Sequence, residues 1–391
     1  MENAPRQLEV REYVDDDEAE CLALRNEVFP PISVMDWRAG GTAAVALLGG
    51  QVVGVVPFAL RTFRLRADLA VKAAFANSVA VVEERRGSGI GAAMMTAAAG
   101  FLPARADAMF VYTGDEAEGR PYRFYRRTGH ADLAYPATYR MVDAGSSAAG
   151  CSVLAEPVDP ASIGALEGEL LDAFNIAWGW HGGHCLHEMG YYQRALSSHI
   201  FVELPVEEFL LARAVVGGRL LGYALVGVRA TGISVLEVAC HPGEAAGALT
   251  AWMWELGLHR GVPVTTWSCR PPYEGVGFHN WARQRRHDVV VGRCIRPDAV
   301  WKAAAGPLAG FLRVEVWTPE GDVNFGPEGA PTLRLEMKRE QLEQLLLCRR
   351  NLESDVRLQQ VTVASGTWRQ VMQASTALQA GQWECHELDY I

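Results

Sequence analysis

Apolar and polar positions along the first 130 residues follow two patterns, one typical of strands and one typical of helices, and these segments alternate. Short runs rich in Val, Ala and Leu, bounded by Gly or charged residues, are typical of half-buried strands. Such runs cover residues 8–13, 43–48, 51–64, 73–82 and 108–113. Helical spacing covers residues 16–27, 89–101 and 120–127, the last stopping at Gly129. The mixture predicts an α/β fold that contains an antiparallel hairpin.

A strand, a Gly-Gly turn and a second strand occur twice in the chain. Residues 48–54 (Leu-Gly-Gly-Gln-Val-Val-Gly) are matched almost position for position by residues 216–222 (Val-Gly-Gly-Arg-Leu-Leu-Gly). Gly-Gly between apolar runs is a hairpin signal. Each hairpin is followed by another apolar strand and a helix of small residues, so the sequence predicts two copies of one α/β domain.

A run of small residues at 144–150 separates the two copies, and the pattern changes again near residue 293. Beyond that point, residues 311–317 and 332–337 alternate like strands around a turn at 319–322. A helix follows, with Leu342, Leu345 and Leu346 on one face. We therefore expect three parts, at residues 1–144, 151–292 and 293–391, of which the last is a small α+β domain.

Composition narrows the functional classes. A chain of 391 residues has room for two or three domains, and none of its apolar runs reaches the roughly 18–20 residues that span a bilayer. A secretory signal is not evident, and the eight cysteines form no C-x-x-C pair, so we expect a cytoplasmic protein with reduced thiols and no membrane partner. The net charge of −10 disfavours nucleic acid and favours cationic small molecules.

The stretch from Val79 to Gly91 carries the clearest chemical signal. An apolar strand runs into a basic glycine loop, and the loop opens a helix. Gly87, Gly89 and Gly91 stand at every second position, which lets backbone N–H groups turn toward one point. The helix N-terminus adds the positive end of its dipole. Such a loop suits a pyrophosphate, and so a nucleotide-type cofactor.

One interpretation of this loop is a dinucleotide site. Residues 87–92 fit the G-x-G-x-x-G/A fingerprint, with Asp115 as the candidate acid for the ribose. Against it, four charged residues at 83–86 separate the strand from the glycines, and the loop follows an antiparallel hairpin. Asp115 also lies beyond the usual spacing of about 20 residues. An NAD(P)-dependent oxidoreductase of the Rossmann type is therefore the alternative rather than the first choice.

The same loop resembles the R/Q-x-x-G-x-G/A motif of the GCN5-related N-acetyltransferases, where it follows a V-x-V strand. Residues 124–130 (Phe-Tyr-Arg-Arg-Thr-Gly-His) are similar to the family's F-Y-x-x-x-G-F segment, with His130 in the last aromatic position. The resemblance implies acetyl-CoA as co-substrate, no metal, and a pantetheine arm aligned by the strand near Val79 and Val81. It also implies that the pyrophosphate is held by the backbone of Arg86, Gly87, Ser88, Gly89, Ile90 and Gly91.

The second copy departs from this pattern. Its matching region, residues 240–249, has no Arg and few glycines, and Glu244 brings negative charge to the place of the phosphates. Two tandem acetyltransferase domains, one degenerate, followed by a small α+β domain resemble the Eis (enhanced intracellular survival) family. This resemblance implies a sterol-carrier-like third domain and a homo-oligomer, a hexamer in that family.

Acetyl transfer to an amine needs an acid for the departing thiolate and a base for the amine proton. Tyr125 matches the family tyrosine, and a phenol with a pKa near 10 is protonated at neutral pH. For the base, the resemblance implies the carboxylate of the chain's last residue, here Ile391 where the family carries an aromatic. An acid beside an indole, as at Asp36 and Trp37, is suited to a cationic amine, and Glu27 is a similar candidate.

These signals predict an N-acetyltransferase that acts on a cationic amine or polyamine-like small molecule, and the resemblance implies aminoglycosides or lysine side chains as acceptors. A non-catalytic, CoA-binding regulatory protein is the second alternative. Residues 181–187 contain three histidines and a cysteine, but their spacing matches no standard structural metal site. We therefore expect no metal there.

Overall fold

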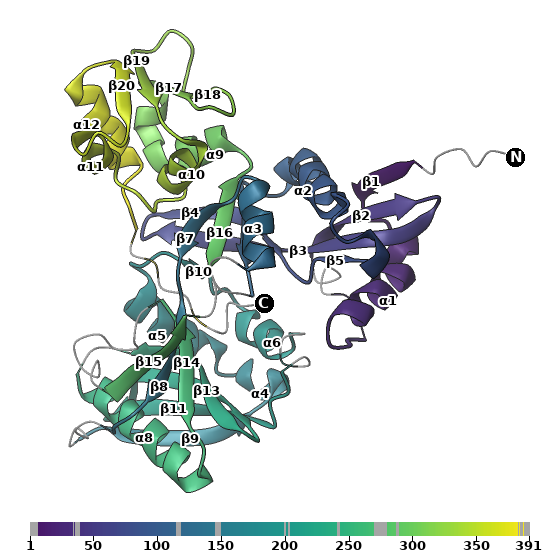
Figure 1. The fold of residues 1–391 in the computed structure, drawn as a ribbon. Coiled ribbons are helices and arrows are strands. Elements are labelled where there is room, and N and C mark those ends of the chain that lie inside the picture. The colour runs from purple at the N-terminus through teal and green to yellow at the C-terminus, as the bar shows by residue number, and fades with distance from the viewer. Residues whose placement is uncertain are drawn as a thin grey trace, which may run out of the picture. The chain divides into compact units, whose positions relative to one another are not determined.

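The computed structural model describes residues 7–33, 35, 40–114, 119–144, 150–198, 201, 204–240, 243–269, 280–286, 289–381, 383 and 386. The chain divides into two compact units, shown in Figure 1. Unit 1 combines residues 1–134 with 289–381, and unit 2 combines residues 135–288 with 382–391. Each unit is described by itself below.

The main sheet of unit 1 contains the predicted hairpin, with strands in the order β1-β2-β3-β4-β6-β16-β7 and β5 paired with β3. Neighbours run antiparallel except β4 and β6, which are parallel. The predicted strand at 73–82 is divided into β4 and β5. The strands are β1 (Leu8–Glu12), β2 (Thr42–Leu48), β3 (Gln51–Arg66), β4 (Leu69–Ala76), β5 (Ala80–Val81), β6 (Ala108–Tyr112), β7 (Ala131–Ala134) and β16 (Val290–Cys294).

Helices cover both faces of this sheet. Successive residues of its strands point to opposite faces, and apolar side chains stand on each face. Val55, on one face, packs with Cys21 and Leu24 of α1, whereas Val56, on the other, packs with Met94 of α2. Both helices are visible beside β2 and β3 in Figure 1. The helical segments here are η1 (Asp15–Asp17), α1 (Glu18–Val28), η3 (Glu83–Arg85), α2 (Ile90–Phe101), η4 (Leu102–Ala104) and α3 (Arg120–Arg127).

The remainder of unit 1 is the predicted α+β block, a sheet in the order β18-β17-β19-β20 with helices beside it. Leu342, Leu345 and Leu346 are all buried, as their spacing predicts. The main-chain N–H of Cys294 on β16 donates to the buried carboxylate of Glu343 at 2.5 Å, which ties the block to the main sheet. Its elements are α9 (Pro297–Ala305), η6 (Gly306–Gly310), β17 (Arg313–Trp317), β18 (Val323–Phe325), β19 (Thr332–Glu336), α10 (Arg339–Leu346), α11 (Leu352–Arg357), β20 (Thr362–Ser365) and α12 (Trp368–Ala377).

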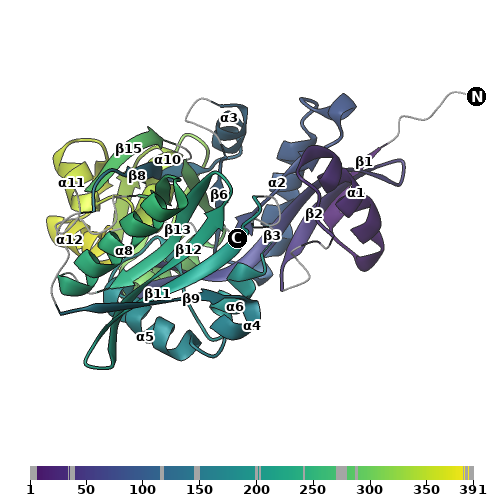
Figure 2. The same cartoon turned by 90° about the horizontal axis from the view of Figure 1, so that it is seen from below.

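Unit 2 contains the second Gly-Gly hairpin in a sheet of order β15-β8-β14-β13-β12-β11-β9. Figure 2 shows α8 on one side of this sheet and α4, α5 and α6 on the other. The elements are β8 (Ala137–Met141), β9 (Ser152–Val158), α4 (Pro160–Ile163), α5 (Glu167–Trp178), β10 (His184–Cys185), α6 (Tyr191–Leu196), β11 (Glu208–Val216), β12 (Arg219–Arg229), β13 (Gly232–Cys240), α8 (Glu244–Arg260), β14 (Val264–Ser268) and β15 (Trp281–Arg286).

The two sheets exchange strands relative to chain order. β8 comes from the first part of the chain but pairs with β14 and β15 in unit 2, whereas β16 follows the second copy but pairs with β6 and β7 in unit 1. The sheets therefore do not consist of consecutive residues. The division at residues 144/151 and 292/293 remains a prediction about patterns along the chain, as does the sterol-carrier-like nature of the third part.

The described helices include none that is both long enough and apolar enough to cross a membrane.

Two of the cysteine side chains in unit 1 are held as thiols by their surroundings. Burial raises the pKa of Cys21 to about 12 and that of Cys348 to about 11.

Candidate functional site

The main sheet of unit 1 opens between two parallel strands. β4 and β6 pair at Ala73–Ala108 and as far as Phe75–Phe110, but β5 pairs only with β3. Between the pairs Phe58–Ala76 and Val55–Ala80, one extra residue enters the strand, and Ser78 there has φ 43°. Such a bulge bends a strand and ends its pairing. The chain therefore leaves β6 just before the glycine loop.

Strand alternation decides which backbone groups face this opening. The N–H of Val82 donates to the carbonyl of Val53 at 3.1 Å, so the backbone of Val82 faces β3. In an antiparallel pair the next residue along presents its N–H and C=O to the opposite side. Val81 therefore points away from β3, and its carbonyl accepts a hydrogen bond from Nε of Arg86 at 3.1 Å. Val79 and Val81 are half-buried, as a strand beside a narrow ligand would be.

The glycine loop that follows is wholly exposed from Glu83 to Gly89. The hydroxyl and the N–H of Ser88 both donate to the carbonyl of Arg85, at 2.5 and 3.3 Å, and these bonds hold the turn together. Gly87 and Gly89 have φ of 80° and 89°, values that residues with a Cβ rarely adopt. Both positions therefore favour glycine over any residue with a side chain.

The loop ends at the N-terminus of α2, which has no side-chain cap. The first main-chain bond of the helix runs from the N–H of Ala93 to the carbonyl of Gly89 at 2.9 Å, so the preceding N–H groups have no partner within the helix. A Cβ on Gly91 would lie 3.1 Å from the ring of Phe124, so this glycine allows α3 to approach. Uncapped N–H groups on an exposed loop, at the positive end of a helix, fit a pyrophosphate.

Tyr125 lies on α3 beside this helix. Its side chain shares a buried cluster with Ile90 and Met94 of α2, and its hydroxyl makes no hydrogen bond to any residue that the structure describes. Burial raises the pKa of Tyr125 above its ordinary value. The phenol is therefore a proton donor rather than an acceptor at neutral pH.

His130 packs against Tyr125, with ring centroids 5.7 Å apart, and occupies the position that the family pattern gives to an aromatic residue. Its Nδ1 lies 3.2 Å from the carbonyl oxygen of Tyr125 and 3.1 Å from the hydroxyl of Thr128. Burial and the nearby charge of Arg293 lower the pKa of His130 to about 3. The imidazole is neutral, so it fills the aromatic position without adding charge.

The remaining residues singled out in the sequence are in part exposed, in part outside the described residues, and in part buried. Glu27 is exposed on α1. Asp36, Trp37 and Ile391, like the alternative ribose acid Asp115, lie outside the described residues. His181, His184 and His187 are buried, and His187 stacks on Phe174 at 3.7 Å. No group of metal-ligating side chains occurs among the described residues.

Two residues of α1 that the sequence analysis did not select are tied into the segment that follows. Arg25 is fully buried, and Asn26 bonds to both main-chain groups of Ile32. A signal was available, because Arg25 stands four residues after Cys21 on the apolar side of the helix.

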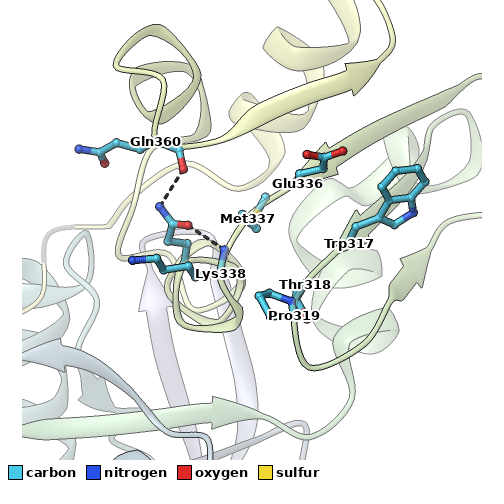
Figure 3. A pocket seen from close by; sticks show the side chains of 8 residues that line it. Trp317, Thr318, Pro319, Glu336, Met337, Lys338 and Gln360 are labelled. Carbon is cyan, nitrogen blue, oxygen red and sulfur yellow. Dashed lines mark hydrogen bonds between the residues drawn. The ribbon is translucent and has the colours of Figure 1, made fainter.

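A cavity of about 650 Å³ lies in the α+β block, lined by the end of β17 and the start of α10. Figure 3 shows that its polar groups bond to one another: the N–H of Lys338 donates to the Gln341 side chain at 2.9 Å. The Gln341 amide in turn donates to the carbonyl of Gln360 at 3.0 Å. None of the glycine-loop residues lines it, so we assign the cavity no part in the chemistry of the loop.

Residues 6–130 match the family model described as the acetyltransferase (GNAT) family. Among solved structures, a probable N-acyltransferase of unknown function from Enterococcus faecalis V583 has a TM-score of 0.72 at 14% identity, covering 97% of this chain and 99% of its own. Eis1 from Mycobacterium abscessus has a TM-score of 0.59 at 15% identity, covering 96% and 98%.

A third structure, a GCN5-related N-acetyltransferase from Kribbella flavida, has a TM-score of 0.69 at 17% identity, with 97% of both chains covered. At these identities the likeness concerns the fold. The sequence matches no curated protein significantly. The mixed sheet with one splayed parallel pair and the family match together reject the dinucleotide-binding alternative. Residues 6–130 are an N-acetyltransferase domain of the GNAT family, in a chain that has the fold of Eis-like proteins.

Proposed function

We propose that this protein transfers an acetyl group directly from acetyl-CoA to the amine of a cationic small molecule, with both substrates bound together. One observation carries the proposal. An exposed glycine loop and an uncapped helix N-terminus stand beside a strand that leaves its neighbour, with a protonated tyrosine on the adjoining helix. Acetyl-CoA supplies an activated thioester.

The loop residues hold the co-substrate in this proposal. Main-chain N–H groups from Gly87 to Gly91 bind the pyrophosphate, and the exposed side chain of Arg86 lies at the edge of the same loop. The backbone of Val81 faces away from β3 and is suited to hydrogen bonds with the amide groups of pantetheine, and Val79 stands just before β5 in the chain. The same strand orients the thioester carbonyl.

Tyr125 holds the proton that the departing sulfur requires. When the amine nitrogen bonds to the acetyl carbon, the carbon–sulfur bond breaks and the phenol donates its proton to the sulfur. An ordinary thiol has a pKa near 8.5, so sulfur would leave as a thiolate anion. A proton donor placed beside the sulfur avoids the cost of releasing that anion. The hydroxyl has no competing partner among the described residues, which leaves it available for this transfer.

The amine must lose a proton before it attacks. We propose the main-chain carboxylate of Ile391 as the base, and Glu27, Asp36 and Trp37 as contacts of the cationic acceptor. Residues added after Ile391 convert its main-chain carboxylate into a peptide bond, so kcat should fall in a C-terminally tagged protein. Full activity of the tagged protein would end the proposed role of Ile391.

An amine panel with detection of free thiol tests the proposed reaction. Aminoglycosides, lysine peptides and polyamines are offered with acetyl-CoA, and thermal stability is measured with acetyl-CoA and with NADH. We expect acetyl-CoA to raise the melting temperature, NADH to leave it unchanged, and at least one cationic amine to release thiol. Binding of acetyl-CoA without thiol release from any amine would favour a CoA-binding regulatory protein instead.

A homo-oligomer, a hexamer by resemblance, is part of the proposal. Light scattering coupled to size-exclusion chromatography gives the mass directly, and a monomer of 42.7 kDa in solution would overturn it.

A further inference from the structure

The cavity of the α+β block lies where two parallel strands end. β17 and β19 are neighbours in the middle of the sheet and pair from Arg313–Thr332 to Trp317–Glu336. After β17 the chain turns to β18 on one side, whereas after β19 it continues through α10 and α11 to β20 on the other. The two chains therefore separate beyond the carboxyl ends of the strands, a common place for a ligand. The cavity of about 650 Å³ there is large enough for a small molecule.

Several polar groups around this cavity are already bonded to other protein groups. The Gln341 side chain joins the N–H of Lys338 to the carbonyl of Gln360, as Figure 3 shows. The hydroxyl of Thr318 donates to the carbonyl of Gly321 at 2.6 Å. These bonds hold the wall of the cavity together, so the same groups are less available to a ligand.

Trp317 and Glu336 differ from these groups, because both present their side chains at the exposed ends of their strands. They stand opposite each other in register, so their side chains project from the same face of the sheet. The residues before them, Val316 and Leu335, are buried on the other face. Trp317 is 42% exposed. Within the described part of the chain, the carboxylate of Glu336 forms no ion pair.

The other lining residues complete an apolar surface around this pair. Pro319 and the buried Met337 both line the cavity, and the N–H of Met337 donates to the carbonyl of Trp317 at 3.1 Å. The side chain of Lys338 extends away from Trp317 in Figure 3. The cavity therefore offers a ligand one indole ring, one carboxylate and apolar surface.

This combination suits a cation that carries alkyl groups. A cation is attracted both by the π electrons of an indole and by the charge of a carboxylate. A bare ammonium group has three N–H donors, and a single carboxylate replaces only part of the hydrogen bonds that it makes to water. A quaternary ammonium group has no donor to satisfy, and its methyl groups can contact apolar side chains.

We propose that this cavity binds a quaternary ammonium group, with Trp317 against the methyl groups and Glu336 supplying the opposite charge. No residue of the glycine loop lines the cavity, so the proposal does not depend on acetyl transfer. Free cations such as choline and trimethylated lysine side chains carry the same group.

The test compares choline with two compounds of the same shape or skeleton, by saturation-transfer NMR titration of the full chain without acetyl-CoA. Ethanolamine keeps the charge and lacks the methyl groups, whereas dimethylbutanol, with carbon in place of nitrogen, keeps the methyl groups and lacks the charge. We expect choline to bind in the millimolar range and the other two to bind about tenfold more weakly. Absence of choline binding would overturn the site, and equal binding of either analogue would overturn its preference for a quaternary cation.

Substitutions assign the binding to the cavity. Trp317→Leu and Glu336→Gln should each weaken choline binding about fivefold or more, whereas Trp317→Phe retains a ring and should stay within about threefold of wild type. Both side chains are exposed, so all three variants should fold, which their melting temperatures check. Unchanged choline affinity in both Trp317→Leu and Glu336→Gln would overturn the proposal.

Two variants in the same block are matched controls. Trp368 is 45% exposed at the start of α12, where its ring meets Arg357 at 4.9 Å, and Glu328 is an exposed acid. Neither lines the cavity, so Trp368→Leu and Glu328→Gln should bind choline as wild type does. An equal loss in these controls would make the binding non-specific and overturn the site. A peptide with one trimethyllysine, titrated beside choline, distinguishes the sources: tighter binding of the peptide assigns the group to a protein, and tighter binding of choline to a free cation.

Discussion

The two copies of the acetyltransferase fold differ at the same point of the same strand. Aligning the Gly-Gly turns at 49–50 and 217–218 places Val55 on Tyr223, and these residues pair with Ala80 and Ala239 respectively. Each copy also has a parallel neighbour that stops pairing before the bulge: β6 pairs with Ala73–Phe75 of β4, and β14 pairs with Ile233–Val235 of β13. The scaffold is therefore repeated in detail.

At the bulge of each strand the side chains are of opposite kinds. The first copy has Ser78, and the strand then leads into an exposed glycine loop. The matching residue of the second copy is Glu237, which is buried and accepts hydrogen bonds from Tyr223 at 2.5 Å and Tyr192 at 3.1 Å. His187 approaches the same carboxylate at 3.5 Å.

The same sheet arrangement therefore leads to an exposed loop in the first copy and to a buried polar cluster in the second. In the first copy the strand leads into an exposed loop and a helix N-terminus without a side-chain cap, an arrangement that suits a phosphate ligand. In the second copy buried side chains bond to one another around Glu237 instead. Chemistry is therefore decided by a few residues at the strand end, and the fold supplies only their positions.

The largest expected effect belongs to Tyr125→Phe, which removes the proposed proton donor of the first copy. We expect kcat to fall about 100-fold, because a positioned acid contributes on this order, with an unchanged acetyl-CoA KM. Since burial raises the pKa of Tyr125, the wild-type rate should show no loss from its deprotonation below about pH 10.

Tyr122→Phe is the control for this variant, since Tyr122 lies on the same helix but bonds to Asp132 at 3.0 Å. It should retain kcat within about twofold. Equal kcat values for the two variants would remove Tyr125 from the role of acid.

A pair of glycine substitutions separates the loops of the two copies. Gly89 and Gly243 are the residues before α2 and α8, with φ of 89° and 117°. Alanine at either position costs about 1–2 kcal/mol of backbone strain, so both variants should melt earlier than wild type. Only Gly89→Ala should raise the acetyl-CoA KM, by about tenfold. A similar rise in Gly243→Ala would mean that the second loop also contacts the co-substrate.

Glu237→Gln tests the sealed end of the second copy. The amide keeps the shape of the carboxylate but weakens two hydrogen bonds from buried phenols, so we expect a loss of about 1–3 kcal/mol in the free energy of unfolding. Denaturant titration measures this loss. Glu169→Gln, at an exposed site on α5, should cost less than about 0.5 kcal/mol. A raised acetyl-CoA KM in Glu237→Gln would contradict a purely structural cluster.

The last expected effect concerns the pH dependence of stability and depends on His130, whose pKa of about 3 in the folded protein lies below the ordinary 6.5. The unfolded chain takes up a proton as pH falls below about 6.5, whereas the folded protein does not until near pH 3. His130 therefore costs stability progressively through that window, up to about 1.4 kcal/mol per pH unit.

His130→Phe should flatten the acid side of the stability curve, measured by denaturant titration at pH 5 and pH 8. The exposed His259 gives the control, since His259→Phe should leave the curve as in wild type. An equally steep acid limb in His130→Phe would show that another group causes it.

Local patterns predicted much of unit 1. The helix at Arg120–Arg127 has the bounds that its spacing predicted, and the glycine loop is exposed before α2 as its composition required. The strand expected at 73–82 was divided, because the bulge at Ser78 depends on pairing with β3 as well as on its own residues. The hydrogen bonds between the Asn26 side chain and the main chain of Ile32 were missed, because a contact across six residues follows no repeating sequence pattern.

By itself, the sequence determined the type and order of the elements, the duplicated hairpin and the loop suited to a pyrophosphate. These features depend on neighbours within a few residues, through side-chain period and the φ values open to glycine. Only the tertiary structure decided that β8 and β16 exchange sheets, and that Glu237 meets Tyr192 and Tyr223. It also decided that Arg25 lies in the core. Those contacts join residues far apart in the chain, and their energies depend on burial and geometry that no local pattern records.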